Sequence, residues 1–112
     1  FHSLCLEPRE RAAADYLRGM GASGLGVEAA ARTAAVLSTG AEGAIPLKEG
    51  YAAAMAAQNT SYACVEKNIR SMVGKLQAGA CGEYQALMGG LPAERPSNEL
   101  FLRRLARRIL EW

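Results

Sequence analysis

The chain has 112 residues, the size of one domain, and half of them are hydrophobic. Alanine, leucine and other helix-favouring residues supply much of that half, whereas aromatic residues make up only 6%, so the composition favours an all-α fold. No apolar run approaches the ~20 residues of a membrane span and no signal peptide is visible, so we expect a cytoplasmic protein with no membrane partner.

The cysteines and the histidine do not form the pattern of a metal site or of a disulfide framework. Cys5, Cys64 and Cys81 are odd in number and lack C-x-x-C spacing, and the only histidine, His2, lies at the end of the chain. We therefore expect reduced thiols, no metal and no cofactor. The first residue is Phe1 rather than methionine, so we also expect a fragment or a processed chain that lacks an upstream domain.

The net charge of +2 is unevenly distributed along the chain. Residues 1–59 carry five basic and six acidic side chains, whereas eight basic and five acidic ones follow. The later basic residues fall in two segments, a helix predicted over residues 61–77 and the tail from Arg95 onward. Such clustering is a better sign of an anionic partner than the net charge is.

Two helices are predicted in the first part of the chain, over residues 7–19 and about 26–38. Gly21 tolerates positive φ and suits the end of the first helix. The second helix carries one apolar stripe, made of Val27, Ala30, Ala34 and Leu37. A loop over residues 39–43 follows, and then a short helical turn at residues 46–49.

Four further helices complete a single six-helix domain over residues 1–112. Three of them cover residues 51–58, 61–77 and 83–88, and the last begins near Ser97 and Asn98, either of which can cap it. The inward-facing residues expected in the last helix are Phe101, Leu102, Leu105, Ile109 and Trp112. The turn-rich loop over residues 89–96 is predicted to be mobile.

The segment from Tyr51 to Leu76 has the layout of a helix-turn-helix. A short alanine-rich helix is followed by a polar break at Gln58-Asn59-Thr60 and then by a longer amphipathic helix. The apolar stripe predicted to bury that second helix consists of Val65, Ile69, Met72 and Leu76, widened by Val73 and Tyr62. In a helix-turn-helix the second helix enters the DNA major groove, so we expect the opposite face to contact DNA.

The residue types on that opposite face suit the reading of base pairs. Arg70 can donate two hydrogen bonds to guanine and Lys67 can do so less rigidly, while Glu66 can accept one from cytosine. The small side chain of Ala63 lets the backbone approach the groove. The other interpretation is a solvated face of mixed charge in which Glu66 and Arg70 form an ordinary i,i+4 ion pair.

Phosphate contacts are predicted at two helix starts. Thr60 and Ser61 precede the second helix of the motif, where hydroxyl groups and free amides can hold a phosphate oxygen. Ser97 and Asn98 offer the same chemistry at the last helix, although capping that helix is the commoner role for such residues. Cys64 lies beside these groups and is interpreted as a small filler rather than a redox-sensitive thiol.

Two segments resemble one protein family. Residues 59–70, NTSYACVEKNIR, are similar to the family pattern Asn-Thr-Thr-x-x-x-Val-Glu-Arg-x-Ile-Arg, and residues 95–109, RPSNELFLRRLARRI, are similar to its Lys-Pro-Thr-Asn-Ser-Glu-Phe-Ile run. Tyr51 also matches a family tyrosine that opens the first helix of the motif. On these residues the chain resembles the C-terminal DNA-binding domain of the sporulation-initiation response regulators, the stage-zero sporulation regulator A family.

The resemblance implies a six-helix effector domain that binds a short box of double-stranded DNA through Glu66, Lys67 and Arg70. It also implies a phosphorelay receiver domain upstream of this chain, dimerisation on tandem sites and a contact with the sigma subunit of RNA polymerase. Four positions depart from the family pattern, among them Gln58, which stands where a buried aromatic residue is usual, and Met55, which stands where a small alanine is usual. Lys67 replaces an arginine, and Cys64 stands where a basic residue is usual, so the DNA box recognised is expected to differ.

The main hypothesis is therefore a sequence-specific, DNA-binding transcription regulator domain. The alternative is a helical protein-interaction module whose basic last helix binds an acidic partner. An enzyme is the least favoured class, because the sequence offers no paired carboxylates, no Cys–His couple and no metal-ligand set.

Overall fold

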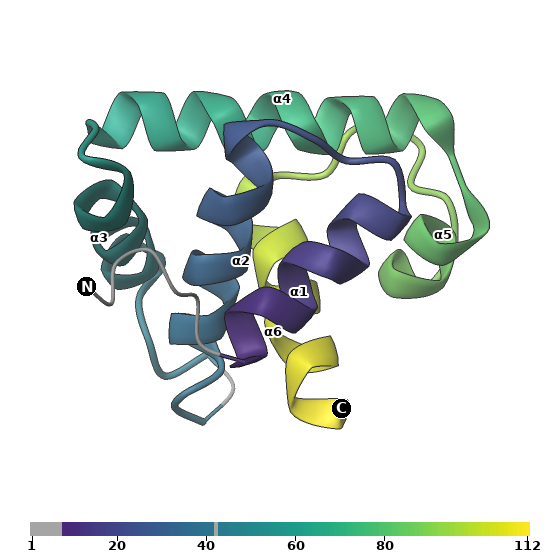
Figure 1. Cartoon of the computed structure of the whole chain (residues 1–112). Helices are drawn as coiled ribbons and strands as arrows, with labels where there is room; N and C mark the ends of the chain where they lie inside the picture. The colour runs from purple at the N-terminus through teal and green to yellow at the C-terminus, as the bar shows by residue number, and fades with distance from the viewer. Residues whose placement is uncertain (1–7, 42) are drawn as a thin grey trace.

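The computed structural model describes residues 8–41 and 43–112 of the chain. These residues contain six α-helices and no strand (Figure 1). The helices are α1 (Pro8–Gly19), α2 (Leu25–Leu37), α3 (Leu47–Gln58), α4 (Tyr62–Gly79), α5 (Gly82–Met88) and α6 (Asn98–Glu111). The predicted all-α, six-helix fold is confirmed. Cys5 and His2 lie outside the described residues.

One predicted boundary is wrong, because the helical turn at residues 46–49 and the helix at 51–58 form the single helix α3. The sequence suggested a break near Gly50, since glycine weakens the interior of a helix. Gly50 instead lies where α3 crosses α2, and a Cβ there would come within 2.6 Å of Thr33 Cγ2. The Thr33 hydroxyl also donates a hydrogen bond of 3.3 Å to the Gly50 carbonyl. A close contact between two helices therefore explains this glycine.

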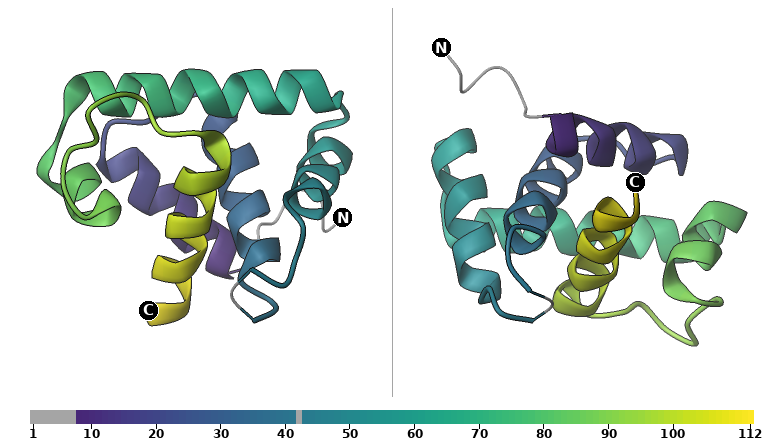
Figure 2. Two further views of the ribbon diagram at one scale, coloured as in Figure 1. Left: turned by 180° about the vertical axis from the view of Figure 1, so that it is seen from behind. Right: turned by 90° about the horizontal axis from the view of Figure 1, so that it is seen from below.

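Helix α2 lies at the centre of the molecule, in contact with α1, α3, α4 and α6 (Figures 1 and 2). It is buried on almost every side, and its fully buried residues include four alanines: Ala29, Ala30, Ala31 and Ala34. Small side chains let neighbouring helices approach α2 closely. The largest buried side chains come from the surrounding helices and are Leu17, Tyr51, Ile69, Tyr84, Phe101, Leu102 and Leu105.

Helix α4 runs along one edge of the molecule, and α2, α3 and α6 all meet it from the same side (Figure 1). The predicted stripe is buried there and consists of Val65, Ile69, Met72, Val73 and Leu76. Gly26 at the start of α2 touches the α4 backbone, since a Cβ at this position would lie 2.5 Å from the Asn68 carbonyl oxygen. One face of α4 is thus fixed against the core and the other points outward.

Two aromatic residues are more exposed than predicted. Tyr62 is 50% exposed, and its ring packs edge-on against the buried ring of Tyr51 at a centroid distance of 5.1 Å. Trp112 is 53% exposed and makes a similar edge-on contact with Tyr16 at 5.4 Å. Both residues lie at the ends of their helices, where fewer neighbours are available to cover a large ring. The other inward-facing residues predicted in α6 are buried.

Candidate nucleic-acid interface

The turn between α3 and α4 is fixed by its own hydrogen bonds. Asn59 adopts the left-handed conformation with φ of 52°, which asparagine tolerates better than most residues. The amides of Asn59 and Thr60 both donate to the Met55 carbonyl at the end of α3. The predicted polar break is therefore present, although Gln58 still belongs to the helix.

Ser61 caps the start of α4. Its hydroxyl oxygen accepts a hydrogen bond of 3.2 Å from the Cys64 amide. In an α-helix the first amides have no intrahelical acceptor, so those of Tyr62 and Ala63 are directed out of the helix end. Ser61 is exposed and Thr60 is half-buried, so both predicted phosphate contacts border the surface at this helix start.

The outward face of α4 carries the predicted base-reading residues. Ala63, Lys67 and Arg70 are exposed, and Glu66 is half-buried at one edge of the face. One Arg70 nitrogen, Nη1, donates to both carboxylate oxygens of Glu66, at 2.6 and 2.7 Å. The i,i+4 ion pair expected for a solvated face is therefore formed. Such exposed pairs contribute only ~0–1 kcal/mol, so a ligand can rearrange this one at little cost.

Arg95 adds a cation to this face that the sequence did not place. Gly74 lies one turn beyond Arg70 on α4 and has no side chain, and the Arg95 Cδ stands 3.5 Å from the position a Cβ would take there. The stem of this exposed arginine, which belongs to the loop before α6, therefore lies against α4 at Gly74. Gly74, seven residues after Lys67, was the signal in the sequence that could have indicated this contact. A glycine on the outward face of a helix leaves room for a side chain from another part of the chain.

The opposite edge of the face is polar as well. Ser71 and Lys75 of α4 line a hollow of about 170 Å³ together with Asn68 and with residues 22–26, which include the first two residues of α2. Ser71 and Lys75 are both exposed. The outward face of α4 therefore has cations along its length and hydroxyl and amide groups at its border.

Asn98 does not lie on this surface, in contrast to the prediction of a phosphate contact. Its side chain is only 8% exposed, and Nδ2 donates to the Tyr51 hydroxyl at 3.1 Å and to the Glu66 carbonyl at 3.0 Å. One amide group thus joins α3, α4 and α6, and Asn98 positions α4 rather than contacting a ligand. Burial raises the pKa of Tyr51, and the Asn98 hydrogen bond opposes that shift.

Ser97 caps α6, the role that was named above as the alternative to a phosphate contact. Its hydroxyl oxygen accepts a hydrogen bond of 3.1 Å from the Leu100 amide at the start of α6. The residue is exposed and follows the buried Pro96. Ser97 therefore stays beside the candidate interface, while its cap is already formed in the free protein.

Cys64 is exposed in the first turn of α4. Hydrogen bonds with the Ser61 and Thr60 side chains hold the pKa of this thiol below its ordinary value, and the positive charge of Lys67 acts in the same direction. A more acidic thiol therefore lies beside the candidate phosphate contacts.

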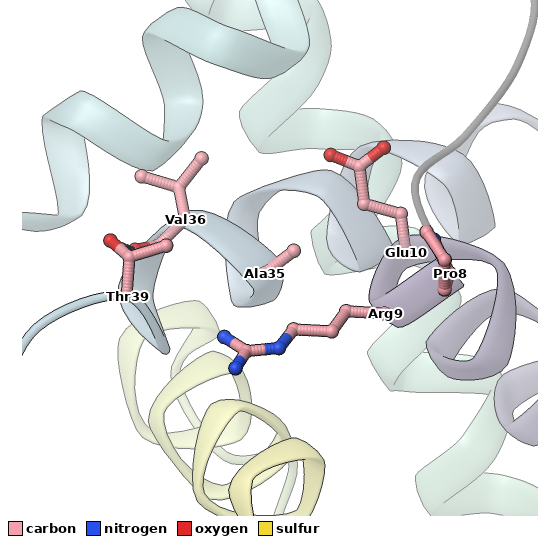
Figure 3. Close-up of a pocket in the computed structure, with 6 residues that line it drawn as sticks. All are labelled: Pro8, Arg9, Glu10, Ala35, Val36 and Thr39. Atoms are coloured by element: carbon pink, nitrogen blue, oxygen red, sulfur yellow. Dashed lines mark hydrogen bonds between the residues drawn. The ribbon is translucent and has the colours of Figure 1, made fainter.

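A separate hollow of about 320 Å³ lies between the start of α1 and the end of α2 (Figure 3). Arg9 reaches across it and donates to the Ser38 hydroxyl at 3.3 Å, while Glu10 accepts from Arg32 at 3.2 Å. Its charged groups are thus engaged with the protein itself. Among the residues that the structure describes, no group of three or more His, Cys, Asp or Glu could hold a metal, and no helix is long and apolar enough to cross a membrane.

Comparisons of the chain with protein-family models, with curated protein sequences and with solved structures find no match. The family resemblance therefore stays a prediction, and the function is argued from the geometry of α4.

Proposed function

We propose that the protein binds double-stranded DNA in a sequence-specific manner, with α3 and α4 acting as a helix-turn-helix and α4 lying in the major groove. The observation that carries this proposal is the outward face of α4, which presents Lys67 and Arg70 beside Glu66 while the opposite face is packed against the core. An α-helix with its side chains is ~10–12 Å wide and the major groove is ~12 Å wide, so the two fit.

The base contacts belong to three residues in this proposal. Arg70 offers a planar guanidinium for the two acceptors of guanine, and Lys67, on the adjacent position of the face, offers a single flexible donor group. Glu66 holds the Arg70 guanidinium in the free protein, so it orders the arginine before DNA arrives. When Arg70 turns to a base, the Glu66 carboxylate becomes available to a cytosine amino group.

The backbone contacts surround these residues. The first amides of α4 and the Thr60 and Ser61 hydroxyls suit a phosphate at the helix start. Arg95 on one edge and Lys75 on the other suit the two phosphate strands that border a major groove. Each of these contacts favours binding without selecting a sequence.

The biological setting rests only on the resemblance, which consists of residues 59–70, residues 95–109 and Tyr51. We infer from it a transcription regulator of sporulation in the cytoplasm, preceded by a phosphorelay receiver domain, dimerising on tandem DNA sites and contacting the sigma subunit of RNA polymerase. These partners concern the complete regulator, whereas the fit of α4 to the groove concerns this chain by itself.

Selection from random duplexes tests the DNA-binding proposal. The chain is expected to enrich one short box and to bind that box more tightly than a shuffled duplex by a factor on the order of 10³, the lower end of the range for specific binders. Affinity for both duplexes should fall steeply with salt, because cations on α4 displace counterions from phosphates. Absence of enrichment, or equal affinity for the selected and shuffled duplexes, would contradict the proposal.

A further inference from the structure

The segment between α5 and α6 runs alongside α4 in the opposite direction (Figure 2, left). Three contacts join the two, and they pair Pro92 with Gln77, Arg95 with Gly74 and Asn98 with Glu66. Successive residues of the segment thus meet earlier and earlier positions of α4. We call residues 91–97 the flanking loop, because they border the side of α4 that carries the proposed base contacts.

Gln77 lies on the same side of α4 as these base contacts. It follows Gly74 by three residues and Arg70 by seven, and this spacing places side chains in one line along a helix. Arg70 is exposed, and Gly74 and Gln77 are half-buried where the flanking loop lies against them. The proposed DNA face is therefore continuous with the place at which the loop is attached.

The Gln77 amide uses both of its ends. Its Nε2 donates a hydrogen bond of 2.6 Å to the Pro92 carbonyl, and its Oε1 accepts one of 2.7 Å from the Tyr84 hydroxyl. The Pro92 carbonyl can only accept, so the amide cannot be turned around without losing that bond. Gln77 therefore tethers the flanking loop to α4 in one orientation.

Tyr84 holds this amide from the core. It is fully buried in α5, and its ring stacks on that of Phe101 in α6 at a centroid distance of 6.5 Å. Burial raises the pKa of Tyr84, so its hydroxyl keeps the proton that it donates to Gln77. A rigid donor behind a half-buried glutamine fixes that side chain before any ligand binds.

A second anchor holds the other end of the flanking loop. Pro96 is buried, and the Asn98 amide donates to the Glu66 carbonyl at 3.0 Å. The two attachment points are eleven residues apart on α4 and six residues apart along the loop. The first separation corresponds to a rise of ~17 Å, and six extended residues span at most ~20 Å. The loop thus has little slack, and Arg95, between the anchors, is kept near Gly74.

We propose that Gln77 and Tyr84 are positioning residues of the DNA interface, which hold the flanking loop so that Arg95 meets a phosphate beside the major groove. The inference rests on the DNA-binding function proposed above. An arginine on a free loop must be ordered when DNA binds, and that loss of entropy weakens binding. The tether orders the loop in the free protein, so the entropy is lost on folding rather than on binding.

The test compares the wild type with Gln77→Met in anisotropy titrations on the selected duplex over a range of salt. Methionine keeps the length of the side chain but cannot donate to Pro92. Affinity should fall about three- to tenfold, and the slope of log affinity against log salt should become shallower, toward that of Arg95→Ala. Gln85→Met is the matched control with no change expected, because Gln85 Nε2 makes a similar bond of 2.8 Å to the Ala80 carbonyl at the turn between α4 and α5.

Two further measurements separate positioning from a general loss of stability. In the Arg95→Ala background, Gln77→Met should have no further effect on DNA affinity, because the glutamine acts through that arginine. Without DNA, endoproteinase Glu-C should cleave after the exposed Glu94 faster in Gln77→Met than in the wild type or Gln85→Met. Tyr84→Phe keeps the buried ring and removes the donor, so it should shift both readouts in the same direction. Melting curves show that each variant is folded.

Several results would overturn this inference. Wild-type affinity or wild-type cleavage in Gln77→Met would show that the tether does not hold the loop for DNA. Losses that add to those of Arg95→Ala would show that Gln77 does not act through this arginine, and an equal effect of Gln85→Met would indicate a general weakening of the domain. All of these results are seen with a wild type that binds the selected duplex. Failure of the DNA function is distinct, because the wild type itself then selects no duplex.

Discussion

At the scale of single residues, Asn98 has the most consequential position, because its one amide group reaches both α3 and α4 from the start of α6. Asn98→Ala removes both hydrogen bonds and leaves the Glu66 carbonyl without this donor. We expect a loss of ~1–3 kcal/mol in the free energy of unfolding, measured by urea denaturation. Ser97→Ala, which removes only the cap of α6, is the neighbouring control and should cost ~0.5–2 kcal/mol.

Asn98→Ala also allows the effect on DNA binding to be measured apart from the effect on stability. Asn98→Ala removes the hydrogen bonds that position α4, the helix that carries the base contacts. The affinity of this variant for the selected duplex should therefore be lower than that of the wild type even at temperatures at which the variant is still folded. A protein with wild-type stability after Asn98→Ala would show that the amide does not join the three helices.

Cys64 provides a pH-dependent readout of the start of α4. Because hydrogen bonds with Ser61 and Thr60 lower the pKa of this thiol, the thiolate forms at lower pH in the folded chain than in the unfolded one. The rate of alkylation of Cys64 by iodoacetamide, followed by peptide mass mapping, should therefore have a lower pH midpoint in buffer than in urea. Ser61→Ala should raise the midpoint of the folded chain, and a folded midpoint at or above that in urea would refute the assignment.

At the scale of helices, α4 has two faces with different tasks. Ile69 is fully buried on the inner face and Lys67 is exposed on the outer one. Ile69→Ala should lower the free energy of unfolding by ~2–5 kcal/mol, because it leaves a cavity, whereas Lys67→Ala should change it by no more than ~0.5 kcal/mol. Thermal and urea melts check both values. Equal effects of the two substitutions would mean that the faces are wrongly assigned.

The sequence was sufficient for the helices other than the first turn of α3, and for the faces of α4, because both depend on local spacing. Val65, Ile69, Met72 and Leu76 recur with the helical period, and they are buried as predicted. The outward position of Lys67 and Arg70 follows from the same period. The break at Asn59 was visible because asparagine there tolerates the left-handed conformation it adopts.

Features that depend on contacts between distant residues were not predictable in this way. Gly50 suggested the end of a helix, yet it is the point at which α3 touches Thr33 of α2. Asn98 suggested a surface group, and only the meeting of α6 with α4 buries it. Arg95 was assigned to a basic tail, and its place over Gly74 depends on the path of the loop before α6.

At the scale of the whole molecule, the arrangement separates two charged surfaces. Helix α4 forms one edge, and α6 leads from it to the C-terminus on another side (Figures 1 and 2). We propose DNA for the first surface.

Arg95 tests whether the DNA surface extends beyond α4 itself. In the proposed complex it contacts a phosphate, so Arg95→Ala should weaken binding to selected and shuffled duplexes alike. The slope of log affinity against log salt should become shallower by about 1. Anisotropy titrations over a range of salt measure this slope. Arg11→Ala removes an exposed arginine from α1 and should leave it unchanged. A selective loss on the selected duplex alone would mean that Arg95 reads a base instead.

The central claim, that the outward face of α4 lies in the major groove, is tested most directly by dimethyl sulfate footprinting of guanine N7 on the selected duplex. Arg70 is expected to protect one guanine, because its guanidinium occupies the N7 and O6 acceptors. Arg70→Ala should expose that guanine alone and cost ~1–3 kcal/mol in binding, while Arg11→Ala keeps the full footprint. Protection that persists unchanged in Arg70→Ala, or protection of no guanine at all in a guanine-containing box, would contradict the placement of α4.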